Sequence, residues 1–180
     1  RLLVDCGFGL AETEARLARL GVALEQIDAI LVTHEHGDHS GGVARAAAKA
    51  GAAIYLTHGT LASLPSRTTA TAQTHVIDSH APFALRDLWV KPFPVPHDAR
   101  EPVQFVFEAA NGRLGLLTDV GALTPHIESM LNGCNAIILE CNHDVDLLRE
   151  GPYPASLKAR VAGRTGHLDN AAAAALLQRI

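Results

Sequence analysis

The sequence lacks an apolar run that could cross a membrane, since none approaches the roughly 18 residues that a spanning helix needs. Its first residues do not have the pattern of a signal peptide. It also lacks an excess of basic residues, because the formal net charge is −4 with histidine neutral. We therefore expect no membrane association, and overall charge alone gives no indication of a nucleic-acid partner, although a local basic patch is compatible with it.

Cysteine is scarce as well. The three cysteines, Cys6, Cys134 and Cys141, form no CxxC pair, and their odd number argues against a disulfide framework. Cys6 and Cys141 lie at the ends of apolar runs, so we expect buried free thiols, which are typical of a reducing, cytoplasmic setting. None of the three neighbours a histidine in a way that suggests an activated nucleophile.

The length of 180 residues predicts one domain, 1–180, and the 48% of hydrophobic residues supplies material for a core. The sequence starts without methionine in the strand-like "RLLVD" and stops inside "NAAAAALLQRI". We therefore expect a domain that is incomplete at both termini.

Short apolar runs alternate with helical patterns along most of the chain. "RLLVDC", "AILVT" and "AAIYLT" predict strands, and "LAETEARLARLG" and "SGGVARAAAKAG" predict helices, the second with Ser40 as a possible N-cap. In the middle, "LWVKPFPV" and "VQFVFEA" alternate polar with apolar residues, and Asn111–Gly112 predicts a hairpin turn into "RLGLLTD". A helix at "ALTPHIESML" and a buried strand at "AIILE" follow. This pattern predicts an α/β fold with a central antiparallel meander.

The stretch "THEHGDHSGG" follows the buried run "AILVT" directly and has the form H-x-H-x-D-H. An extended backbone would put His34 and His36 on one side, and a turn would let Asp38 and His39 point back to the same cavity. Imidazole and carboxylate suit zinc, iron or manganese, and four potential ligands suggest two ions. A solvated polar turn is the alternative, but such groups are costly to bury unpaired.

Later polar residues repeat this placement at strand ends or helix entrances. His97 follows "FPVP", Asp119 ends "LGLLT", the segment "ECNHD" (140–144) follows "AIIL", and His167 precedes a helix. Each alone has an ordinary explanation as a loop, turn or helix-start residue. Together with the first cluster, they favour a shared site where the strand ends converge.

The order H-x-H-x-D-H, a later His, a later Asp and a final His resembles the metallo-β-lactamase superfamily, whose fold is an αββα sandwich. The resemblance implies that His34, His36 and His97 hold a first metal ion, that Asp38, His39 and His167 hold a second, and that Asp119 bridges both. True β-lactamases have cysteine at the position of Asp119, which disfavours antibiotic hydrolysis here.

The strings "FPVPHDAREPVQFVF", "LGLLTDVG", "ILECNHDVDLLREGPYP" and "GHLDNAAAA" resemble the YycJ/WalJ branch, which is related to ribonuclease Z. This resemblance implies a 5′–3′ DNA exonuclease with two divalent metal ions, either zinc, manganese or iron. A metal-bridging hydroxide would attack the phosphodiester, with Asp119 clamping both ions and Asp38 orienting the nucleophile. The branch commonly has "ESNHD" and "GHLSN" where this chain has "ECNHD" and "GHLDN", and neither change removes a ligand.

Several points stay open on the sequence alone. His143 can act on the substrate as a catalytic donor, or "NHD" can be the N-cap region of the next helix, with Asn142 or Asp144 capping. The basic residues between Arg149 and Arg164 predict either a solvated helix face or a phosphate-binding surface. The rival functions are a small thioester or ester hydrolase of the glyoxalase II kind and a metal-binding module without turnover. The oligomeric state is open.

Overall fold

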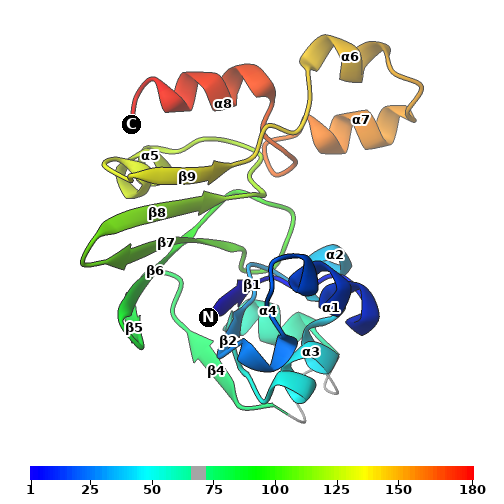
Figure 1. The fold of residues 1–180 in the computed structure, drawn as a ribbon. Coiled ribbons are helices and arrows are strands. Elements are labelled where there is room, and N and C mark those ends of the chain that lie inside the picture. Colours follow the sequence, from blue (N-terminus) through cyan, green and yellow to red (C-terminus); the bar gives the residue numbers. More distant parts are fainter. Residues whose placement is uncertain (66–71) are drawn as a thin grey trace. The chain divides into compact units, whose positions relative to one another are not determined.

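The computed structural model describes residues 1–65 and 72–180. The chain divides into two compact units, each with its own sheet and its own apolar core (Figure 1). The first unit comprises Arg1–Asp78 and Ala99–Pro102, and the second comprises Ser79–Asp98 and Val103–Ile180.

The first unit contains a parallel sheet of four strands in the order β1-β2-β3-β4. These strands are β1 (Leu2–Val4), β2 (Ala29–Leu31), β3 (Ala53–Thr57) and β4 (Thr74–Ile77). Parallel neighbours require crossover connections. Helices lie in these connections: α1 (Leu10–Arg19) with a 3-10 turn (Leu24–Gln26), then α2 (Gly37–Ser40) and α3 (Val43–Ala50), and finally α4 (His58–Ser63). The three strands predicted for this part of the chain and the helix predicted from "LAETEARLARLG" are thereby confirmed.

The helix predicted from "SGGVARAAAKAG" begins later than expected. Ser40 ends α2, and its hydroxyl donates to the carbonyl oxygens of Glu35 and His36, so the prediction of Ser40 as an N-cap is wrong. Gly42 occupies the N-cap position of α3. A Cβ atom on Gly42 would lie 2.0 Å from the carbonyl oxygen of Phe8, so only glycine lets this turn pack against the loop after β1.

The second unit contains a five-stranded sheet in the order β5-β6-β7-β8-β9. The strands are β5 (Phe83–Leu85), β6 (Leu88–Pro94), β7 (Val103–Ala109), β8 (Gly112–Leu117) and β9 (Ala136–Leu139). The first four form an antiparallel meander, and β9 runs parallel to β8. Ala109 pairs with Gly112 across the Asn111–Gly112 turn, which confirms the predicted hairpin.

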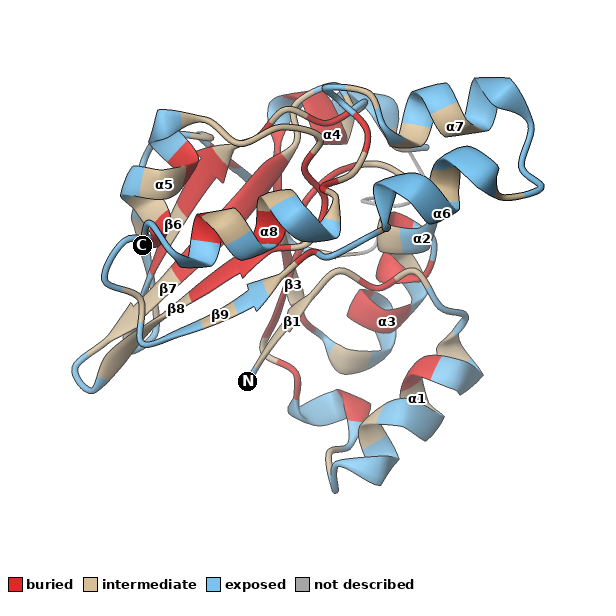
Figure 2. Ribbon diagram, turned by 90° about the horizontal axis from the view of Figure 1, so that it is seen from above, coloured by how far each residue is buried: buried red, intermediate tan, exposed pale blue. Residues whose placement is uncertain are grey.

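Two helices cover this second sheet. Side chains of α5 (Pro125–Leu131) and α8 (Asn170–Leu177) form one core cluster with Phe93, Val106 and Leu117 of the sheet (Figure 2). The helices α6 (Val145–Glu150) and α7 (Ala155–Val161) project from this layer and contribute no buried residue.

The strand β9 is less buried than its sequence predicts. It is an edge strand whose side chains alternate between exposed and half-buried, and Ile138 is 53% exposed. Cys141, just beyond this edge, is also exposed, so the prediction of a buried thiol is confirmed for Cys6 but wrong for Cys141. Among residues 1–65 and 72–180, no helix has the length and apolar character needed to cross a membrane.

Truncation of Phe93 to alanine should destabilise the second unit by about 3–5 kcal/mol, since the ring is fully buried between sheet and helices. Trp89→Ala on the same strand is the control, because Trp89 is 53% exposed and its loss should cost about 1 kcal/mol or less. Denaturant unfolding of both variants measures the difference. Equal losses would contradict this assignment of the core.

Candidate metal centre

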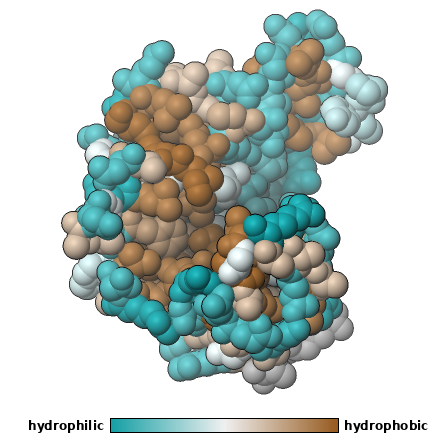
Figure 3. Space-filling view, in the orientation of Figure 1, coloured by the Kyte–Doolittle hydropathy of each residue, from teal (hydrophilic) through white to brown (hydrophobic). Residues whose placement is uncertain are grey.

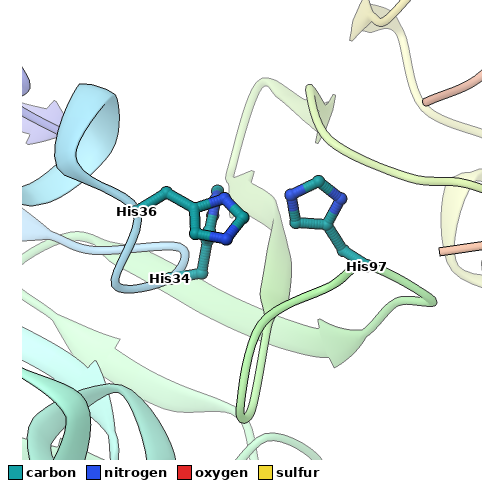
Figure 4. Close-up of side chains that lie close together, drawn as sticks. All are labelled: His34, His36 and His97. Atoms are coloured by element: carbon teal, nitrogen blue, oxygen red, sulfur yellow. The ribbon is translucent and has the colours of Figure 1, made fainter. Parts of the chain in front are cut away.

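The first unit places four of the predicted ligands on the segment that leads from β2 into α2. His34 is buried, His36 and His39 are half-buried, and the Asp38 side chain is 83% exposed. Figure 4 shows His34 and His36 on this segment. The ring of His34 lies 4.5 Å from that of His36 and 4.2 Å from that of His39, measured between centroids. The local H-x-H-x-D-H pattern therefore gathers its three imidazoles.

Asp5, which no sequence pattern indicated, holds this group in place through hydrogen bonds. Its Oδ1 accepts from the backbone N–H of Thr33 at 2.8 Å. Its Oδ2 accepts from the Thr33 hydroxyl at 2.8 Å and from Nδ1 of His39 at 2.9 Å. A metal-binding histidine commonly donates its second ring N–H to such an oxygen, which leaves the other nitrogen available for the ion. For His39 that other nitrogen is Nε2, which lies 3.6 Å from a carboxylate oxygen of Asp38.

His34 is oriented through the same chain of hydrogen bonds. The Thr33 hydroxyl donates its proton to Asp5, so its oxygen accepts from Nδ1 of His34 at 2.9 Å. Nε2 of His34 then presents its lone pair to Nδ1 of His36, 3.0 Å away. Two nitrogen ligands of a tetrahedral zinc ion lie about 3.3 Å apart. The pair is thus spaced nearly as a cation would require.

The second unit holds the other predicted ligands, and two of them are histidines on different loops. His97 follows β6 and is buried, and Figure 4 draws its side chain on that loop. Its Nδ1 donates to the carbonyl oxygen of Gly166 at 3.1 Å. His167 follows Gly166 directly, and the rings of His97 and His167 lie 5.3 Å apart. Two loops far apart in sequence therefore meet within this unit.

Glu140 holds His167 in place. It follows β9, is buried, and lies with Oε1 2.6 Å from Nδ1 of His167. Its Oε2 accepts from the backbone N–H groups of Val120 and Leu168, at 2.9 Å and 3.3 Å. The sequence indicated Glu140 as a polar residue at a strand end, but not this role.

Asp119 completes the cluster of the second unit. Its Oδ1 lies 3.6 Å from Nδ1 of His167. Asp119, Glu140 and His167 each offer a ligand atom within 4.8 Å of the others, which is a spacing able to hold a metal ion. The chain thus carries clusters of histidine and carboxylate groups that suit a divalent cation.

The predicted alternatives around His143 are partly resolved. Asp144 is the N-cap of α6 and accepts from the backbone N–H groups of Asp146 and Leu147, each at 2.9 Å, which confirms the capping interpretation for Asp144. His143 itself forms a β-bridge with Asp169, and its side chain lines a cleft beside α6. A catalytic role of His143 stays a prediction.

The cations of the basic stretch differ in their partners, and its role as a phosphate-binding surface stays a prediction. Arg149 forms ion pairs with Asp146 at 2.8 Å and Glu150 at 3.3 Å, as a solvated helix face does. Lys158 instead donates to the carbonyl oxygen of Arg149, and Arg164 is exposed. Within the described parts of the chain, neither of these last two cations has a carboxylate partner.

A family model described as the beta-lactamase superfamily domain matches residues 1–180. The chain belongs to this superfamily. It is 35% identical to exodeoxyribonuclease YycJ of Bacillus anthracis over 97% of this chain and 67% of that protein. It is 32% identical to exodeoxyribonuclease WalJ of Streptococcus pneumoniae over 94% of this chain and 65% of that protein. The chain thus spans about two thirds of the length of these relatives.

The solved structures agree on the fold. The metallo-beta-lactamase fold protein YhfI from Bacillus subtilis superposes with a TM-score of 0.73, over 99% of this chain and 69% of that chain, at 15% identity. The metallo-β-lactamase fold and the YycJ/WalJ-like family, both predicted from the histidine motif and the later strings, are confirmed.

The hydrogen bond from His167 to Glu140, helped by the charges of Glu140, Asp119 and Asp98, raises the pKa of His167 above its ordinary 6.5, although burial opposes this shift. In the metal-free protein this imidazole therefore stabilises the fold fully below pH 6.5, and the contribution is lost as the pH rises through the raised pKa. Glu140→Gln should lower the pKa of His167, as followed by NMR titration of the metal-free protein.

The matched control for that experiment is Glu128→Gln, since Glu128 pairs with Arg179 at 2.9 Å and has no contact with His167. It should leave the titration of His167 unchanged. If His167 titrates in Glu140→Gln as in the unaltered protein, Glu140 does not govern this imidazole.

Proposed function

We propose that the two units together form a single domain with one dinuclear metal site, and that the protein is a metal-dependent phosphodiesterase. Its proposed activity is that of a 5′–3′ DNA exonuclease. The observation that carries this proposal is that four imidazoles, those of His34, His39, His97 and His167, each have Nδ1 bonded to an oxygen acceptor. In that arrangement Nε2 is the ring nitrogen that would offer its lone pair to a cation.

The proposed ligands divide into two sets. His34, His36 and His97 would hold one ion, Asp38, His39 and His167 would hold the other, and Asp119 would bind both. The donor set of imidazole and carboxylate fits zinc, manganese or iron. When bound, two such ions lower the pKa of a coordinated water and offset the charge that the phosphodiester gains during reaction.

The reaction adds water across a phosphodiester bond. A bond forms between phosphorus and the water oxygen, the bond between phosphorus and the leaving nucleoside oxygen breaks, and that oxygen takes up a proton. Asp38 orients the attacking water, a role that suits its 83% exposed side chain. His143 donates to a phosphate oxygen or to the leaving oxygen. Asp5 and Glu140 act as positioning residues, since each holds a ligand histidine.

DNA is the proposed substrate because both reported relatives, at 35% and 32% identity, are named exodeoxyribonucleases. The aspartate at position 119 further separates the chain from β-lactamases, which carry cysteine there. The free thiols support the cytoplasm as its compartment.

The full-length protein, supplied with manganese, should shorten a labelled, 5′-phosphorylated single-stranded DNA stepwise from its 5′ end. Asp119→Ala should reduce the rate at least about a thousandfold, since it removes a charge from between the ions. Gel electrophoresis of the products over time gives both polarity and rate, and the double variant Asp38→Ala/His39→Ala should be equally inactive.

Glu128→Gln, which alters a carboxylate outside the proposed site, is the control and should cleave at the normal rate. Hydrolysis of thioesters such as those cleaved by glyoxalase II, with no cleavage of DNA, would replace the nuclease with the small-ester hydrolase. Retention of turnover by a folded Asp119→Ala protein would contradict the two-metal reaction itself.

A further inference from the structure

A cleft of about 390 Å³ lies between α6 and α7 within the second unit. Its wall includes the apolar side chains of Leu147, Tyr153, Leu157 and Val161. Three of these are exposed rather than packed into a core: Leu147 by 74%, Tyr153 by 55% and Leu157 by 37%. Figure 3 shows apolar atoms on this helix pair, bordered by hydrophilic ones. A cleft of this volume is suited to a small planar ligand.

The polar end of the cleft contains an unsatisfied nitrogen. Nδ1 of His143 is buried and has no hydrogen-bond partner among the described residues. Leaving a buried polar atom unpaired is unfavourable, so a rotation of the His143 ring that brings this nitrogen to a hydrogen-bonding group of a ligand in the cleft would relieve the cost. A purely apolar occupant would not satisfy it.

The cleft lies close in the chain to the candidate metal cluster of its unit. The helix pair lies between Glu140 and His167, which are themselves hydrogen-bonded. Asn142 N–H donates to the carbonyl oxygen of Leu168 at 3.0 Å, and the bridge between His143 and Asp169 joins the two ends of this segment. The base of the cleft is thus tied to the residues that carry the cluster.

Of the described residues that line the cleft, the one that is charged is Asp144, whose carboxylate caps α6, and cations that could pair with a phosphate lie outside the lining, on α7 and just beyond it. Lys158 lies on α7 and Arg164 follows it, and neither charge is neutralised by a carboxylate within residues 1–65 and 72–180. An aromatic platform beside cations is the combination that proteins use to hold single-stranded nucleic acid, with bases stacked and phosphates paired.

We propose that the α6–α7 cleft binds one nucleobase of the substrate strand, stacked on Tyr153 with a hydrogen bond to Nδ1 of His143, while Lys158 and Arg164 contact flanking phosphates. Nε2 of His143 then keeps the proposed role of donor to a phosphate oxygen or to the leaving oxygen. This proposal rests on the proposed nuclease function and assigns part of its substrate recognition. The apolar wall needs a planar, uncharged group, and the base supplies one together with hydrogen-bonding edges.

The test compares binding of two fluorescein-labelled single-stranded oligonucleotides to the full-length protein by anisotropy, with chelator present to prevent cleavage. One oligonucleotide carries thymine throughout, and the other has abasic sites in the same backbone. The unaltered protein should bind the thymine strand more tightly. Tyr153→Ala should bind it about tenfold more weakly and no longer distinguish the two strands, whereas Tyr153→Phe, which keeps the ring, should bind normally.

Trp89→Ala removes an aromatic side chain of similar exposure, 53%, from a different surface and should leave the affinity unchanged. The proposal is wrong if the unaltered protein binds both strands equally, or if Tyr153→Ala still distinguishes them normally. Neither result bears on nuclease activity, which the cleavage assay measures separately. If the unaltered protein is a dimer and Tyr153→Ala is a monomer that still binds DNA normally, the cleft is instead a surface that binds a second copy of the chain. Absence of both cleavage and DNA binding in the unaltered protein would overturn the proposed function as well.

Discussion

The hydrogen bond between an imidazole Nδ1 atom and an oxygen acceptor is the interaction on which the candidate metal centre depends. An unrestrained histidine can rotate and can carry its proton on either nitrogen, so it presents no fixed lone pair. Asp5 removes that freedom from His39, and Glu140 removes it from His167. Both carboxylates also bind backbone N–H groups, which fixes them in turn. The backbone of each unit thereby fixes the orientation of these two imidazole rings through the carboxylates.

Parallel strand pairing explains why these carboxylates are in reach. Val4 pairs with Leu31 in β1 and β2, so the residues just beyond both strands, Asp5 and Thr33, emerge at the same edge. Leu117 pairs with Leu139 in β8 and β9, and the residues that follow are Asp119 and Glu140. The carboxyl ends of parallel strands share one edge, which is where α/β proteins bind their ligands. Each unit thus gathers its own candidate ligands by the same rule.

The sequence predicted the parts of this arrangement that are local. His34, His36, Asp38 and His39 lie within six residues of one another, and a strand followed by a turn suffices to gather the imidazoles. Asp5 was missed because its partners are 28 and 34 residues away, and only the pairing of β1 with β2 brings them together. Glu140 was noticed at a strand end, yet its hydrogen bond to His167 spans 27 residues and depends on the loop before α8.

Burial was less predictable than position. An apolar pattern such as "AIIL" is compatible with a central strand or with an edge strand, and only the sheet order places β9 at the edge and leaves Cys141 exposed. In the same way, the sequence between Arg149 and Arg164 indicated a helix face but not that apolar side chains of α6 and α7 would line a cleft. The placement of His97, Asp119 and His167 at strand ends favoured a site shared with the first motif, and the family resemblance added the expected role of each as a metal ligand.

The proposed dinuclear centre makes the oriented imidazoles and Asp119 ligands of two ions. Anomalous diffraction from crystals of the full-length protein, measured at the absorption edge of the bound metal, locates these ions. We expect two peaks a few ångströms apart, with His34, His36 and His97 around one, Asp38, His39 and His167 around the other, and Asp119 touching both. A single peak, or peaks away from these side chains in a metal-loaded protein, would contradict it.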